Sequence, residues 1–195
     1  MDEPIIEKHG GYRSLKSFHV AQLVYDVTVL FCRSYVPLKS RTHDQMVQAA
    51  RSGVQNIAEG SQAAGTSRST ELKLTNVARA SLEELKLDYE DFLRQNNLAV
   101  WADEDPRLSR LIAARPAYSA AVGVWARSVR KAEGNVAGFP EITANGALTL
   151  IRVACSLLGR QIRSQAAAFE TDGGITERLY YARQKAKRNR TREQG

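Results

Sequence analysis

Apolar residues recur at steps of three and four over most of the chain, the spacing that places them on one face of an α-helix. This pattern predicts a first helix that begins near Ser14 or Ser17 and ends at about Tyr35. Pro37 limits it, because the residue before a proline is pushed out of the helical conformation. No stretch shows the alternation of apolar and polar residues that is typical of a strand.

A second helix is predicted to begin at Thr42. Thr42 and Gln45 match a capping box, in which each side chain satisfies a backbone N–H of the other residue. Glycine inside a helix costs about 1 kcal/mol relative to alanine, so Gly53 indicates a place where a neighbouring helix packs closely. The apolar face of this helix carries Met46, Ala50, Gly53 and Ile57.

Two longer runs of the same spacing predict a third and a fourth helix. The third begins within 66–70 and ends at Asn96 and Asn97, and its apolar face carries Leu72, Thr75, Ala78, Leu82, Leu85, Tyr89 and Phe92. The fourth begins at Pro140, since proline suits the first helical turn, and ends before Gly173 and Gly174. Its apolar face carries Ala144, Leu148, Ile151, Cys155, Leu158, Ile162, Gln165 and Phe169.

Four long amphipathic helices with short links between the first three predict an all-α fold, an antiparallel up-down four-helix bundle. Residues 98–139 do not continue the pattern, and they are predicted to form a helical insertion broken at Pro116. The predicted organisation is an N-terminal arm (1–14), the first three helices (15–97), the insertion (98–139), the fourth helix (140–172) and a basic C-terminal tail (173–195).

The excess positive charge lies near the C-terminus. The chain has 28 Lys and Arg residues against 21 Asp and Glu residues, a formal net charge of +7. Seven of the basic residues and no acidic residue lie within 178–192, so the other 21 basic residues balance the 21 acidic ones. A segment of this kind can bind phosphates by releasing counterions, and its Tyr180 and Tyr181 can stack on unpaired bases.

Composition indicates a globular protein, with 43% hydrophobic and 25% charged residues. Apolar runs such as Val27 to Cys32 are too short to span a membrane, and the N-terminus lacks the apolar region of a secretory signal. Cys32 and Cys155 have no CxxC partner and are interpreted as reduced core thiols. These features predict a cytoplasmic protein.

The stretch from Gly60 to Ser67 resembles a phosphate-binding loop in which Thr66 replaces the lysine. A working loop needs that lysine and a preceding strand, whereas the residues before Gly60 continue the periodicity of the second helix. The glycines are therefore interpreted as a connection between helices, with Gly60 or Gly65 at the end of one helix. Thr66, Ser67 or Thr70 is then the cap of the next.

The same region resembles a known family. The segments Asn56-Ile57-Ala58-Glu59-Gly60 and Ala80-Ser81-Leu82-Glu83-Glu84-Leu85, joined by a polar loop, are similar to the signature of the four-helix-bundle proteins encoded in ribosomal RNA intervening sequences. The resemblance covers about residues 15–95 and extends to the fourth helix. The insertion and the tail depart from the short members and look most like the subgroup with a C-terminal suffix.

This resemblance implies a homo-oligomeric ring, which in the family is often a pentamer. It also implies a relation to the accessory variability proteins of diversity-generating retroelements, which bind nucleic acid and a reverse transcriptase. A role in helix packing and in the subunit contact is expected for the motif residues Gly53, Asn56, Ile57, Glu59, Gly60, Leu82 and Leu85.

A cluster of acidic residues on the third helix suggests a metal site, but the histidines do not fit. Bundle di-metal sites use a histidine three residues after a glutamate, and His9, His19 and His43 are never so placed. A solvated face, with Glu83 beside Lys86 or Glu90 beside Arg94, is the preferred interpretation. Arg79 could add to a basic surface, but a pair with Glu83 four residues on is preferred. No metal and no cofactor are predicted; the cluster is Glu83, Glu84, Asp88, Glu90 and Asp91.

The main functional prediction is a non-enzymatic oligomeric protein that binds RNA or DNA through Arg178, Tyr180, Tyr181, Arg183, Lys185, Lys187, Arg188, Arg190 and Arg192. One alternative is a protein–protein adaptor, for example for a reverse transcriptase, that holds its partner through the 98–139 insertion with Trp101 and Trp125. A second is a helical ribonuclease, since Arg13 and His19 match a loose Arg-x(4–6)-His pattern in which the histidine moves the proton of a ribose hydroxyl.

Overall fold

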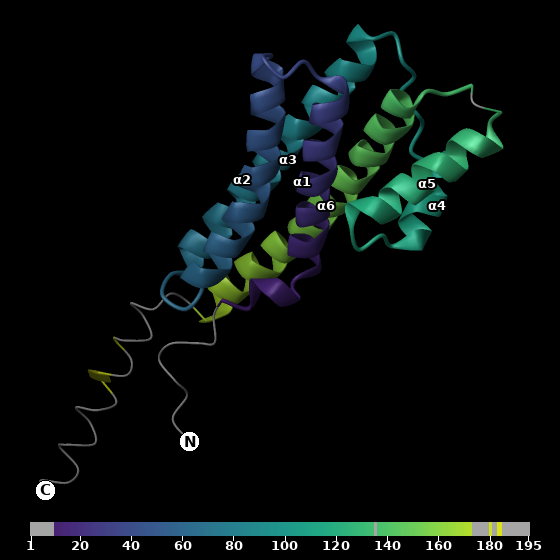
Figure 1. Ribbon diagram of the computed structural model, residues 1–195. Coiled ribbons are helices and arrows are strands. Elements are labelled where there is room, and N and C mark those ends of the chain that lie inside the picture. The colour runs from purple at the N-terminus through teal and green to yellow at the C-terminus, as the bar shows by residue number, and fades with distance from the viewer. Residues whose placement is uncertain (1–9, 135, 173–179, 181–182, 185–195) are drawn as a thin grey trace, which may run out of the picture.

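The structure, a computed structural model, describes residues 10–134, 136–172, 180, 183 and 184. Within these residues the fold is all-α and has no strand, as predicted, and Figure 1 shows its four long helices packed together. Two shorter helices, α4 and α5, come between α3 and α6 in the chain and pack against α6. The elements are η1 (Gly11–Ser14), α1 (Lys16–Tyr35), α2 (Arg41–Ala63), α3 (Arg68–Gln95), α4 (Pro106–Ala114), α5 (Ser119–Ala132) and α6 (Phe139–Asp172).

Serine hydroxyls begin both α2 and α3. The Ser40 hydroxyl accepts a hydrogen bond from the Thr42 backbone N–H at 3.1 Å, and Ser40 is the N-cap of α2. The predicted capping box is therefore wrong, because Thr42 and Gln45 already lie inside the helix. Ser67, one of the three predicted caps of α3, accepts from the Thr70 backbone N–H at 3.2 Å.

Glycines on α2 let α3 approach closely. Gly53 is buried, and a Cβ atom added to it would lie 2.8 Å from Leu82 Cδ2. Gly60 is buried in the last turns of α2, where a Cβ atom would lie 3.3 Å from the Glu71 carbonyl oxygen. Since α2 continues to Ala63, the stretch that resembles a phosphate-binding loop is a helix end with a short connector, as interpreted from the sequence.

Aromatic side chains of α1 and α3 fill one part of the core. Tyr89 is fully buried, and its hydroxyl donates a hydrogen bond to Thr28 Oγ1 at 3.1 Å. Thr28 in turn donates to the Val24 carbonyl oxygen at 2.7 Å, so these buried polar groups are paired. The Phe31 ring centroid lies 4.9 Å from that of Tyr89 and 4.8 Å from that of Phe92.

Both cysteines are free thiols within the packed helices. Cys32 is fully buried on α1, with its Sγ atom 3.8 Å from Met46 Sδ, and Cys155 is half-buried on α6. Burial raises the pKa of each thiol to about 12. Because the thiolate is the reactive form, these cysteines are poor nucleophiles at neutral pH.

Two tryptophans anchor the insertion in the core. Trp101 and Trp125 are only 5% and 7% exposed. Trp101 Nε1 donates to Glu141 Oε1 of α6 at 2.9 Å, and Trp125 Nε1 donates to the Arg107 carbonyl oxygen at 3.0 Å. The alternative prediction of an adaptor that grips a partner with these tryptophans is therefore wrong for both side chains, because they are enclosed by their own chain.

Arg107 joins the insertion helices to one another. Its guanidinium lies over the Trp101 ring, 3.4 Å from the centroid. It donates to Glu133 from Nη1 at 2.8 Å and to Asp105 Oδ2 from Nη2 at 2.7 Å. The hydrogen bonds from Arg107 hold the pKa of Asp105 below its usual range. This network connects the start of α4 to the end of α5.

From the sequence, the apolar runs are too short to span a membrane, but α6 is long and apolar. By these criteria alone, residues Phe139–Thr171 could cross a membrane. However, 61% of the most apolar stretch is buried inside the structure. Such burial is typical of the central helix of a folded helical domain.

Candidate nucleic-acid interface

The predicted nucleic-acid contacts fall mostly beyond the residues that the structure describes. Tyr180 and Arg183 are described, and both side chains are exposed, Tyr180 by 59%. An exposed tyrosine and an exposed arginine are suited to contact bases and phosphates. The other predicted contacts lie outside the described residues: Arg178, Tyr181, Lys185, Lys187, Arg188, Arg190 and Arg192.

The tail follows a helix end that is fixed to the rest of the structure. Arg68 at the start of α3 donates from Nη1 to the Ala168 carbonyl oxygen of α6 at 2.8 Å. Gln165 Nε2 donates to Glu71 Oε1 at 2.8 Å. Figure 1 shows this end of α6 beside the connection between α2 and α3. The chain therefore leaves α6 from a defined end of the structure.

Acidic and basic residues are concentrated in different segments of the body of the protein. The equal totals of 21 basic and 21 acidic residues hide this separation. Residues 64–105 contain nine acidic and five basic residues, and residues 106–169 contain two acidic and nine basic residues. The second segment forms α4, α5 and nearly all of α6. Excess positive charge therefore begins well before the tail. The nine basic residues are Arg107, Arg110, Arg115, Arg127, Arg130, Lys131, Arg152, Arg160 and Arg163.

Part of this charge lines a groove of about 350 Å³ between α4 and α6, here called the α4–α6 groove. Arg152 forms an ion pair with Asp103, whose side chain is 67% exposed. Arg160 is exposed two turns further along α6. The lining combines charged, hydroxyl and apolar groups: Asp103, Ile112, Arg152, Val153, Ser156 and Arg160.

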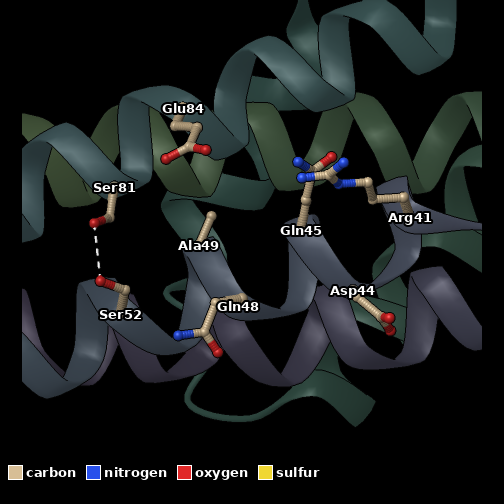
Figure 2. Close-up of a pocket in the computed structure, with 8 residues that line it drawn as sticks. All are labelled: Arg41, Asp44, Gln45, Gln48, Ala49, Ser52, Ser81 and Glu84. Carbon is tan, nitrogen blue, oxygen red and sulfur yellow. Dashed lines mark hydrogen bonds between the residues drawn. The ribbon is translucent and has the colours of Figure 1, made fainter.

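A larger groove of about 490 Å³ lies between α2 and α3, and Figure 2 shows Ser81 and Glu84 reaching toward α2. The hydroxyl oxygens of Ser52 and Ser81 are 3.0 Å apart and share a hydrogen bond across it. Its charged lining residues are Arg41, Asp44 and Glu84. Because acidic groups outnumber the one basic group in this lining, the groove lacks the excess positive charge that phosphates require.

Most residues of the motif that resembles the intervening-sequence family are buried, and Gly53, Gly60 and Leu82 lie in the contact between α2 and α3. Ile57, Leu82 and Leu85 are 1% exposed or less, and Gly53 and Gly60 are buried as described above. Asn56 Nδ2 donates to the Ser52 carbonyl oxygen at 2.9 Å. Glu59 points the other way and is exposed.

The acidic stretch of α3 carries ion pairs along its own helix. Lys86 Nζ lies 3.8 Å from both Glu83 and Glu90, and Arg94 Nη2 lies 2.8 Å from Asp91. The predicted pair of Glu83 with Lys86 is confirmed, whereas Arg94 pairs with Asp91 and not with Glu90. In the part of the chain that the structure describes, no ion pair joins Arg79 to Glu83. Within the described residues, no group of three or more His, Cys, Asp or Glu residues is placed to hold a metal ion.

The two residues of the ribonuclease-like pattern lie on separate elements. Arg13 is exposed on η1, with its guanidinium 5.3 Å from the Tyr12 ring centroid. His19 is exposed on the first turns of α1, with its ring 6.0 Å from that of Phe18. No hydrogen bond joins Arg13 to His19 in the described part of the chain, so the structure does not assemble the pair as a site.

Comparison of the chain with protein-family models, with curated proteins and with solved structures finds no match. The resemblance to the intervening-sequence family therefore rests on the sequence motifs alone.

Proposed function

We propose that this protein is a non-enzymatic nucleic-acid-binding protein, and that its four long helices form an antiparallel up-down four-helix bundle that carries a basic tail. One observation supports this more than any other: seven basic residues and no acidic residue lie within 178–192. Arginine and lysine side chains next to phosphates release condensed counterions, which gives affinity that does not depend on sequence.

The body would act as a platform for the tail. The end of α6 is held against the start of α3 by the hydrogen bonds of Arg68 and Gln165, so the tail starts from a fixed point. In a ring of subunits, as the family resemblance implies, several tails would bind one nucleic acid at high effective concentration. A cytoplasmic location fits this role, since RNA is abundant there.

Binding of labelled oligonucleotides, measured by fluorescence anisotropy, tests this function. The full chain should bind single-stranded RNA or DNA, and the affinity should fall steeply as salt is raised. A variant in which glutamine replaces all seven basic residues of 178–192 keeps the chain length and should lose most of the affinity. The control replaces three exposed basic residues elsewhere, Arg33, Arg51 and Lys73, and should bind nearly as well as the unmodified chain. Equal binding by the tail variant and the unmodified chain would refute the proposal.

A second candidate function, a protein–protein adaptor, is favoured by apolar side chains on the insertion. Val100, Ile112, Tyr118, Val124 and Val136 are between 47% and 88% exposed. Such side chains are suited to contact a protein partner, for example a reverse transcriptase. If Tyr118→Ser together with Val124→Ser abolished capture of that partner while RNA binding was kept, the adaptor function would be supported.

A further inference from the structure

The α4–α6 groove has the chemistry of a phosphate-binding surface on the body of the protein. Resting on the proposed function, we propose that the sugar-phosphate backbone of a single strand held by the tail also lies in this groove. Arg152 and Arg160 would contact its phosphates. The groove then extends the tail's binding site along α6 rather than forming a separate site.

The spacing of the two arginines suits a strand. They are eight residues apart on one helix, which corresponds to about 12 Å along its axis. An extended single strand can place more than one phosphate along a span of this length, so both arginines can contact the same strand. Ser156 lies between them and offers a hydroxyl donor. A strand along α6 therefore meets a donor at each turn of the helix.

Asp103 forms an ion pair with Arg152 at the groove. A guanidinium has five N–H donors, and a carboxylate engages only some of them. A phosphate can therefore approach Arg152 from the open side, although the carboxylate opposes its negative charge. Asp103 is accordingly expected to lower the affinity of the groove, and its removal is expected to raise it.

Two apolar side chains also line the groove. Ile112 of α4 is 47% exposed, and Val153 of α6 is half-buried beside the arginines. A nucleic-acid strand presents charged phosphates on one side and less polar sugars and bases on the other. This mixed lining therefore matches a strand better than it matches an acidic peptide, whose carboxylates gain nothing from Ile112.

Continuity with the tail also favours a nucleic acid. Arg163, exposed one turn beyond Arg160, extends the positive charge by one turn, before Glu170 and Asp172 at the end of α6. Asp172, the last residue of α6, is 12 residues beyond Arg160, or about 18 Å along the axis. The seven basic residues of 178–192 follow shortly after it. A strand bound along α6 would thus run toward the helix end from which the tail follows in the chain.

The test measures binding of a labelled single-stranded RNA to the full chain and to three variants at about 0.1 M salt. Arg160→Ala should weaken binding by about 3- to 10-fold and reduce the slope of log K against log salt by about 0.7. Asp103→Asn should strengthen binding by about 2- to 5-fold, because it frees Arg152. Arg51→Ala is the control. Arg51 is exposed on α2, a helix that packs against α1 and α3, so this variant should change the affinity for RNA only slightly. All three side chains are exposed, so equal thermal unfolding is expected.

The outcomes separate this proposal from the function on which it rests. If the full chain binds RNA and both groove variants bind like Arg51→Ala, the groove makes no contact and only the tail function stands. If the full chain binds no RNA at any salt concentration, both proposals fail. Labelled poly-glutamate distinguishes an acidic protein partner: if Arg160→Ala loses affinity for this peptide but keeps its affinity for RNA, the assignment of the groove to nucleic acid is overturned.

Discussion

Gly53 lets α2 and α3 pack closely because it has no Cβ atom. We expect Gly53→Ala to destabilise the protein by about 1 kcal/mol. The added methyl would lie 2.8 Å from Leu82 Cδ2, and Leu82 is fully buried. Overpacking of this kind costs about 1–3 kcal/mol, whereas the gain in helix propensity is about 1 kcal/mol. Urea unfolding measures the difference.

Gly159 is the matched control for this substitution. It lies in the interior of α6, where the nearest atom to an added Cβ is Arg163 Nη1 at 3.8 Å. Gly159→Ala should therefore stabilise the protein by up to about 1 kcal/mol. If Gly53→Ala were also stabilising, the account of close packing beside Leu82 would be incorrect.

Asp88 is expected to make stability depend on pH. Burial raises the pKa of its carboxyl, and Glu84 and then Asp91 add to this effect by repulsion. A folded-state pKa above the unfolded value means that ionised Asp88 lowers the stability at neutral pH. This loss disappears as the pH falls through the raised folded pKa to the unfolded value of about 3.9.

Asp88→Asn should therefore raise the free energy of unfolding by a few tenths of a kcal/mol at pH 7, a value reduced by solvent screening. The gain should vanish at about pH 4 and below. Asp26→Asn, an exposed change on α1, is the control and should have no effect at either pH. Chemical unfolding across this pH range provides the measurement, and a gain that persisted at pH 3 would contradict the explanation.

At the scale of elements, Arg107 holds the insertion together. We expect Arg107→Ala to destabilise the protein by about 2–4 kcal/mol, because it removes the stacking on Trp101 and leaves Asp105 and Glu133 without their shared partner. Hydrogen exchange should increase across α4 and α5. Arg110→Ala, an exposed substitution one turn away, should change stability by less than about 0.5 kcal/mol. Equal stability of the two variants would exclude a structural role for the Arg107 network.

The long helices could be predicted from the sequence because each has a buried face that repeats over many turns. The start of α2 could not be predicted in this way. Thr42 and Gln45 match the capping pattern, but the chain turns just before them. The Ser40 N–H donates to the Pro37 carbonyl oxygen at 2.8 Å, and this turn places Ser40 in the extended conformation of an N-cap. A local pattern does not reveal the length of such a turn.

The docking of the insertion was beyond prediction for a different reason. Trp101 and its partner Glu141 are 40 residues apart in the chain, and Arg107 and Glu133 are 26 apart. Periodicity reveals that α4 and α5 are helices, but it gives no information about which distant side chains satisfy their polar groups. The sequence therefore did not reveal that Trp101 and Trp125 are enclosed by their own chain.

At the scale of the whole molecule, the sequence identifies the basic tail but not the groove that extends it. The positive charge of 178–192 can be counted directly. The α4–α6 groove brings Ile112 together with Arg152 and Arg160, which lie 40 or more residues further along the chain. The excess of basic residues within 106–169 was available from the sequence, but averaging over the whole body concealed it.

The salt dependence of RNA binding tests the central claim most directly. Each phosphate that is neutralised on a single strand contributes about −0.7 to the slope of log K against log salt. Seven tail contacts therefore predict a slope of roughly −5 for the full chain, and replacement of those seven residues by glutamine should leave a slope shallower than about −2. A full-chain slope shallower than −1, or the same slope in both proteins, would contradict binding through the tail.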